Sequence, residues 1–175
     1  MNWTQLLNEE LDYLYRVTDA LFEIVDDARL DWKPEAGENW MTTGQLLMHT
    51  ATSNGPGFKG FVTGDWGMPD GTSLEDMEPD EMLPPAEEML TVESVAQARE
   101  LLARDREQAL EVLQSVSEED LAGRQLAAPW NPGESFELGR HLLHSIHHSM
   151  QHKGQLFYYL KLQGKPVNTG HLWGM

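Results

Sequence analysis

The sequence contains no cysteine and has little positive charge. Without cysteine the chain can form no disulfide, thiolate metal ligand or cysteine nucleophile, so any metal site must be built from His, Asp, Glu and water. Twelve Lys and Arg residues accompany 29 Asp and Glu residues, which gives a formal net charge of −17. Because nucleic acids and acidic membrane surfaces are bound largely through basic side chains, we expect neither as a partner.

Long apolar runs are missing as well. No stretch approaches the roughly 20 apolar residues that a bilayer-spanning helix needs, and residues 1–4 lack the charged and then apolar pattern of a signal peptide. We therefore expect a soluble, cytoplasmic protein. A chain of 175 residues is long enough to bury a core, and we expect one domain over residues 1–175, with a C-terminal tail at residues 165–175.

Apolar residues at three- and four-residue steps predict four helices. They cover residues 3–26, residues 42–52, a run from Thr91 or Ser94 to Leu113, and residues 136–163. Gly164 has the position of the residue that ends the fourth helix. No strand pattern competes with these helices. We therefore predict an all-α, antiparallel-type four-helix bundle with a long loop between the second and third helices.

The connections between these helices are rich in glycine and proline. Gly55-Pro56-Gly57 should end or kink the second helix, and residues 58–63 can then resume it. Residues 64–90 are expected to form a long irregular connection. Residues 117–120 are expected to form a short capped turn, and residues 129–135 a loop.

Five of the seven histidines lie within twelve residues of the fourth helix. At about 100° per residue, three of them share a narrow arc of that helix: His141, His148 and His152. His144 lies at the edge of the arc, and His147 points elsewhere. Two histidines four residues apart can bind one metal ion together. One helix rarely completes a site, however, so a third ligand should come from elsewhere in the chain.

The histidines have two interpretations. They could form a solvated polar face, because the opposite face of the helix is apolar: Leu142, Leu143, Ile146, Met150, Phe157 and Leu160. Alternatively they form a metal site, because the arc continues into Gln155 and Tyr159 and not into charged residues. An isolated histidine, His49, also lies in an apolar stretch of the second helix. The residues alone leave both interpretations open.

Two motifs resemble those of the DinB-like family. The last-helix segment His148-Ser-Met-Gln-His152-Lys-Gly-Gln155 is similar to the family's His-x-x-x-His motif with a following basic residue, Gly and Gln. The segment Gly44-Gln-Leu-Leu-Met-His49 is similar to the family's lone histidine about a hundred residues upstream. Gly64-Asp65-Trp66 resembles a turn often found after that helix. By order and length the resemblance covers essentially the whole chain.

The resemblance implies an up-down-down-up four-helix bundle, commonly a homodimer, with a divalent metal held by three histidines. Carried over position by position, the ligands are His49, His148 and His152, whereas the other three histidines of the fourth helix match no ligand position. Zinc or nickel suits imidazole ligands best. The family also implies an enzyme with a small-molecule substrate. Its reaction would be hydrolysis, or transfer or isomerisation with a low-molecular-weight thiol.

Three residues are candidates for proton transfer at such a site: Glu10, His144 and Tyr159. Glu10 could equally be a solvated carboxylate at the edge of the first helix. The alternative function is a non-catalytic metal- or ligand-binding protein of the stress response. A polar cavity open to the metal would favour the enzyme, and a sealed site would favour the binding protein. The interruption at residues 55–57 could reorient His49 or open such a cavity.

Overall fold

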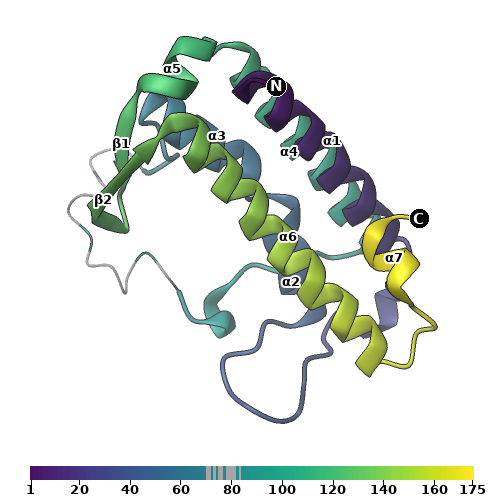
Figure 1. Cartoon of the computed structure of the whole chain (residues 1–175). Coiled ribbons are helices and arrows are strands. Elements are labelled where there is room, and N and C mark those ends of the chain that lie inside the picture. Colours follow the sequence, from purple (N-terminus) through teal and green to yellow (C-terminus); the bar gives the residue numbers. More distant parts are fainter. Residues whose placement is uncertain (70–71, 73, 75–76, 78–81, 83) are drawn as a thin grey trace.

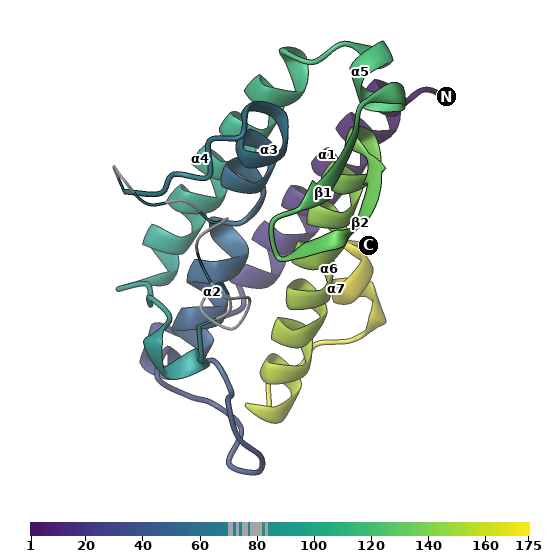
Figure 2. The ribbon, with the colours of Figure 1, turned by 90° about the vertical axis from the view of Figure 1, so that its left-hand side faces the viewer.

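Long helices packed side by side dominate the computed structural model (Figure 1). The structure describes residues 1–69, 72, 74, 77, 82 and 84–175. The helices are α1 (Trp3–Phe22), α2 (Thr43–Ala51), α3 (Asn54–Thr63), α4 (Val95–Gln114), α5 (Glu118–Gly123), α6 (Leu138–Leu162) and α7 (Thr169–Trp173). Figure 2 shows α2 and α3 following one another alongside α4. Both α2 and α3 also contact α6, and α1 packs against α4 and α6.

Leucine, phenylalanine and alanine side chains from α1, α2, α3, α4 and α6 fill one buried core. Burial of these apolar surfaces is the main favourable contribution to folding. In the part of the chain that the structure describes, no helix is long and apolar enough to cross a membrane.

Most helix boundaries agree with the sequence pattern. Ser94 caps α4, and Gly164 adopts a left-handed φ of 78° just after α6, as expected of a residue that ends a helix. The predicted end of the first helix at residue 26 is wrong, because α1 ends at Phe22. The apolar pattern continues into Ile24, but the chain there forms single turns and then a short 3₁₀ helix (Asp27–Arg29), which Asp26 caps.

The structure is mostly helical, as the all-α prediction expects, but the expectation that the chain has no strand is wrong. Residues 125–137 form an antiparallel hairpin of β1 (Gln125–Ala128) and β2 (Asn131–Glu137), where we expected a loop at residues 129–135. Most β2 residues are exposed and include Pro132 and Gly133, so no alternation of apolar and polar residues marks the strand. Its pairing with β1 and its contact with α6 hold the hairpin instead.

Two predicted regions outside the long helices have short helical elements. The capped turn predicted at residues 117–120 is the start of α5, which Ser117 caps. The predicted connection over residues 64–90 contains a 3₁₀ turn at Ala86–Glu88, and its residues 70–71, 73, 75–76, 78–81 and 83 lie outside the described residues. The C-terminal tail contains α7, which lies against α1 (Figure 1).

The break between α2 and α3 is stabilised from a third helix. It lies at Thr52 and Ser53, so Pro56 falls in the first turn of α3, where its missing N–H costs no hydrogen bond. Ser53 makes no side-chain cap. The buried carboxylate of Asp105 on α4 takes that place, accepting hydrogen bonds from the N–H groups of Asn54 (3.2 Å) and Gly55 (2.8 Å).

The environment of Asp105 explains why glycine occupies position 55 and tyrosine occupies position 15. A Cβ at position 55 would lie 3.1 Å from an Asp105 oxygen and 2.6 Å from the amide oxygen of Gln108, so glycine lets the two helices approach. The Tyr15 hydroxyl donates a third hydrogen bond to Asp105 at 2.7 Å. Burial raises the pKa of Asp105 to about 6, although these three donors act in the opposite direction.

We predict that Asp105→Ala lowers the free energy of unfolding by about 3 kcal/mol, because it leaves the Tyr15 hydroxyl and two backbone N–H groups buried without a partner. Urea denaturation measures this loss. The control is Asp31→Ala at an exposed position, which should change stability by no more than about 0.5 kcal/mol. Equal stability of the two variants would contradict the capping role.

Candidate metal centre

Three histidines from two helices meet between α2 and α6. His49 comes from α2, and His148 and His152 come from successive turns of α6. The Nε2 atoms of His49 and His148 lie 2.9 Å apart, and one ring nitrogen from each of the three residues lies within 4.8 Å of the others. Two nitrogens bound to one zinc ion lie about 3–4 Å apart. The cluster is therefore of the right size to hold a single ion.

The break after α2 fixes the position of this cluster. The Ser53 hydroxyl lies 3.0 Å from the Ser149 hydroxyl, and the Asn54 amide donates to the same oxygen at 2.9 Å. These contacts join the start of α3 to α6 immediately beside His148. At the other end of α2, Thr42 and Gln45 form a capping box. Held at both ends, α2 presents His49 to the α6 histidines, and the Gly-Pro-Gly interruption does not turn it away.

Partial desolvation favours the neutral form of the clustered imidazoles, of which His49 and His152 are half-buried and His148 is more exposed. It lowers the pKa of His49 to about 4, with a further contribution from His152 and His148. It lowers the pKa of His148 to about 4 as well, with a further contribution from His152, and it shifts the pKa of His152 in the same direction. Neutral imidazole is the form that binds metals, so the cluster is ready to bind at pH 7.

A chain of hydrogen bonds orients the His152 ring. Its Nδ1–H donates to the side-chain oxygen of Gln155 at 3.1 Å, which leaves Nε2 free to act as a ligand. The Gln155 amide donates to the Tyr159 hydroxyl at 3.3 Å, and that hydroxyl donates to the Met41 carbonyl at 2.9 Å. Tyr159 is buried, which raises the pKa of its hydroxyl. Its place in this chain is that of a positioning residue.

A cavity of about 460 Å³ lies next to the cluster and is lined by residues of α3, α6 and the hairpin. It reaches the histidine cluster at His148. Its aromatic wall consists of Phe61, Trp130 and Phe136. Polar side chains also line it, among them Ser53, Glu134 and His144. A volume of this size is in the range that holds small-molecule ligands.

The order of these features along the chain is that of a known family. A family model described as the DinB superfamily matches residues 10–156, which include all three clustered histidines. The chain belongs to the DinB superfamily. No curated protein matches it. The family that the two histidine motifs indicated is thereby confirmed.

Within this DinB chain, the candidate proton-transfer residues have different surroundings. His144 lines the cavity one turn before His148. Tyr159 lies in the hydrogen-bond chain behind His152. Glu10 is half-buried on α1 and does not line the cavity. His144 is therefore the one of the three that a bound molecule would contact.

The other histidines of α6 are kept out of the cluster by their partners. His141, which the helical arc grouped with His148 and His152, is buried and donates from Nε2 to the Leu126 carbonyl at 2.7 Å. Its ring stacks on Phe61 with centroids 4.4 Å apart. His141 thus attaches the hairpin to α6 and α3. His147 is exposed.

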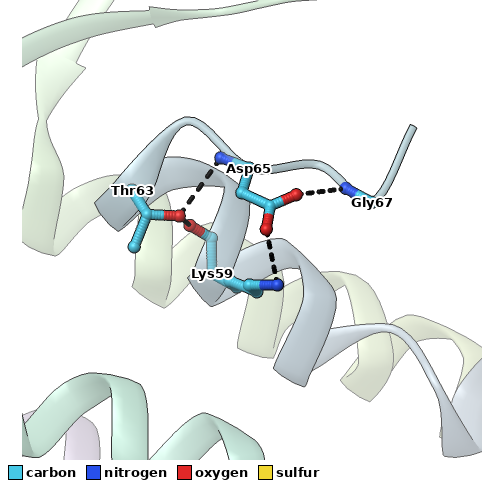
Figure 3. A network of polar contacts seen from close by, with 4 residues as sticks. All are labelled: Lys59, Thr63, Asp65 and Gly67. Atoms are coloured by element: carbon cyan, nitrogen blue, oxygen red, sulfur yellow. Dashed lines mark hydrogen bonds and ion pairs between the residues drawn. The ribbon is translucent and has the colours of Figure 1, made fainter. Parts of the chain in front are cut away.

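The turn after α3 supports the aromatic wall. Asp65 pairs with Lys59 at 2.6 Å and accepts a hydrogen bond from the Gly67 N–H at 2.9 Å (Figure 3). This turn directs Trp66 back onto α3, where a Cβ at Gly60 would collide with its ring. The sequence motif Gly64-Asp65-Trp66 therefore indicated this turn correctly. No motif or periodicity in the sequence indicated the hairpin residues of the cavity, such as Trp130 and Glu134.

We predict that protein freed of metal by a chelator loses stability as the pH falls from about 6.5 toward 4. His49 and His148 have a pKa of about 4 when folded and about 6.5 when unfolded, so the unfolded state binds their protons first. Asp105, whose folded pKa is raised, contributes with the opposite sign between about 6 and 4.

Comparison of variants isolates the histidine contribution. His148→Gln should show a smaller loss of stability between pH 6.5 and 4 in urea denaturation, because one of the two depressed groups is gone. The control is His147→Gln, because this adjacent histidine lies outside the cluster, and the variant should follow the unmodified protein. Identical pH profiles for all three proteins would show that burial does not depress these imidazoles.

Proposed function

We propose that this DinB protein is a metal-dependent enzyme that hydrolyses a small molecule bound beside the three histidines. One observation carries the proposal: a cavity of about 460 Å³ reaches the cluster at His148 and has His144 in its wall. A sealed cluster would instead have favoured a metal-binding protein without turnover.

The donor set fits zinc or nickel. His49, His148 and His152 would each supply one ring nitrogen, and the imidazoles are neutral at pH 7. The hydrogen bond from His152 to Gln155 would keep the ligating nitrogen directed at the ion. When bound, a divalent ion lowers the pKa of a water or thiol and polarises a carbonyl group.

His144 is the proposed proton-transfer residue. Partial desolvation lowers the pKa of His144, and the neighbouring charge of Arg140 acts in the same direction, so both favour the neutral imidazole. A neutral imidazole in the cavity wall can accept a proton from the attacking nucleophile and return it to the leaving group. The hydrogen bonds of Tyr159 to Gln155 and Met41 favour a positioning role for that residue.

Water is the favoured nucleophile over a low-molecular-weight thiol. The chain has no cysteine of its own. Many small cellular thiols carry carboxylates, and among the described residues that line the cavity there is no Lys or Arg to pair with them. Transfer or isomerisation with a thiol is therefore the second candidate reaction.

The proposal also covers the topology of the helix bundle and the number of chains in the assembly. The pair α2–α3, together with α1, α4 and α6, would form the up-down-down-up bundle that the family resemblance implied. Tyr158 and Leu162 on α6 are 65% and 66% exposed. Their apolar surface supports the expected homodimer.

We predict that the purified protein binds about one divalent ion per chain. Elemental analysis after gel filtration measures the content. His148→Ala and His152→Ala should each lose most of the metal, because two imidazoles hold an ion much less tightly than three. The matched control is His147→Ala, an exposed histidine of the same helix, which should retain it. Unchanged content in the first two variants would refute the site.

We predict that the metal-loaded protein hydrolyses an ester, amide, epoxide or halogenated compound without added thiol. In His144→Gln the kcat should fall roughly 100-fold or more, with metal content unchanged, because proton transfer in the transition state contributes that much. A screen of these substrates with and without cysteine-derived thiols measures it. Turnover only with thiol would establish the second reaction, and bound metal without any turnover would establish the binding protein.

A further inference from the structure

We propose that the cavity beside the three histidines selects a molecule with an aromatic ring and a positive charge, such as an arylalkylamine. This inference rests on the proposed function, because it names the substrate class of the same site. It depends on the walls of the cavity that the hairpin and α3 supply.

The aromatic wall is built for a flat ring. Phe61 and Trp130 have ring centroids 5.7 Å apart at an angle of 73°, and Trp66 lies behind both, at 4.9 and 5.5 Å. Such edge-to-face packing fixes the orientation of each ring. Trp130 is nevertheless 45% exposed, so part of this fixed ring remains open. A rigid, open indole is the kind of surface on which another aromatic ring stacks.

The charge of the wall favours a cation. Glu134 supplies a carboxylate, which the Asn131 amide contacts at 3.4 Å. No Lys or Arg occurs among the described residues of the lining to neutralise it. The whole chain also carries a formal charge of −17, which attracts cations and repels anions over longer distances.

The aromatic rings themselves act in the same direction. The face of an aromatic ring attracts a cation, most strongly for indole. One ring of this wall already makes such a contact, because the guanidinium carbon of Arg140 lies 4.0 Å from the Phe136 centroid. Arg140 thus occupies the Phe136 ring, whereas no cation of the described residues lies over the Trp130 ring, which remains for a ligand.

The hairpin and α6 would therefore have separate tasks. Glu134 and Trp130 belong to the hairpin, and His144 and His148 belong to α6. The hairpin would hold the ring and the ammonium group, and α6 would face the bond that reacts. The ammonium group of the ligand would then pair with Glu134 of the hairpin, and a metal ion would be held by histidines of α2 and α6.

Three indole compounds of similar size and different charge test the inference: tryptamine, tryptophol and indole-3-acetate. Isothermal titration calorimetry of the metal-loaded protein should give the tightest binding for tryptamine. Its Kd should be about fivefold lower than that of tryptophol, as expected for one carboxylate at short range, and indole-3-acetate should bind weakest. Equal affinities, or tightest binding of the acid, would overturn the inference.

Two variants assign the effect to the wall. Trp130→Ala should weaken tryptamine binding by about fivefold to tenfold, because it removes the open ring. The matched control is Trp173→Ala, an exposed tryptophan of α7 outside the cavity. Glu134→Gln should abolish the preference for tryptamine over tryptophol, and the exposed Glu111→Gln should leave it intact. Equal effects of the cavity and control variants would overturn the inference.

The same titrations separate this inference from the proposed function. Elemental analysis of each sample reports the metal independently of ligand binding. If the protein binds no metal and still prefers tryptamine, the proposed function is refuted and the cation-selective wall is supported. If the protein binds metal and turns over substrate but shows no preference for tryptamine, the cation-selective wall is refuted and the proposed enzyme is supported.

Discussion

The contact on which the rest of the structure depends is the cap that Asp105 supplies to the start of α3. A helix that begins in the interior exposes N–H groups that must find a partner, and Ser53 provides no cap. The buried carboxylate of α4 accepts two of these N–H groups and the Tyr15 hydroxyl. Because this cap exists, the chain can break after α2 inside the bundle. His49 before the break and Phe61 after it both face α6 as a result.

Along α6, the covering element decides what each histidine does. Near its start the hairpin lies against the helix, and its Leu126 carbonyl binds His141. Two turns later α2 lies against the helix, and His49 meets His148 and His152 instead. The cavity is lined both by residues next to α2, such as Ser53, and by hairpin residues, such as Trp130, and it has His144 in its wall. One histidine-rich face thus provides a structural contact, a cavity wall and a metal-type cluster.

The sequence predicted only some of the contacts that these residues make with other elements. Periodicity predicted the long helices, and the two histidine motifs predicted which three imidazoles would meet, although 103 residues separate His49 from His152. Helical geometry by itself grouped His141 with them, because it describes one helix and not what covers it. Asp105 looked like any charged residue of an amphipathic helix, since its partners are backbone groups about 50 residues away. The hairpin had no signal because exposed strands need no apolar alternation.

The two proposed walls of the cavity differ in charge, and the excess of acidic residues in the chain affects what binds at each of them. The clustered imidazoles favour the neutral form and would leave the full charge on a bound ion, which the long-range potential of a chain with net charge −17 would attract. The same potential would repel an anionic substrate from the cavity and concentrate a cationic one there. A bound ion attracts an anionic group or a polarised oxygen at short range. A substrate with an aromatic ring, an ammonium group and a polarisable bond therefore satisfies both walls at once. Glu134 and Trp130 line the same cavity as His144 and His148, so such a molecule would contact both groups of residues.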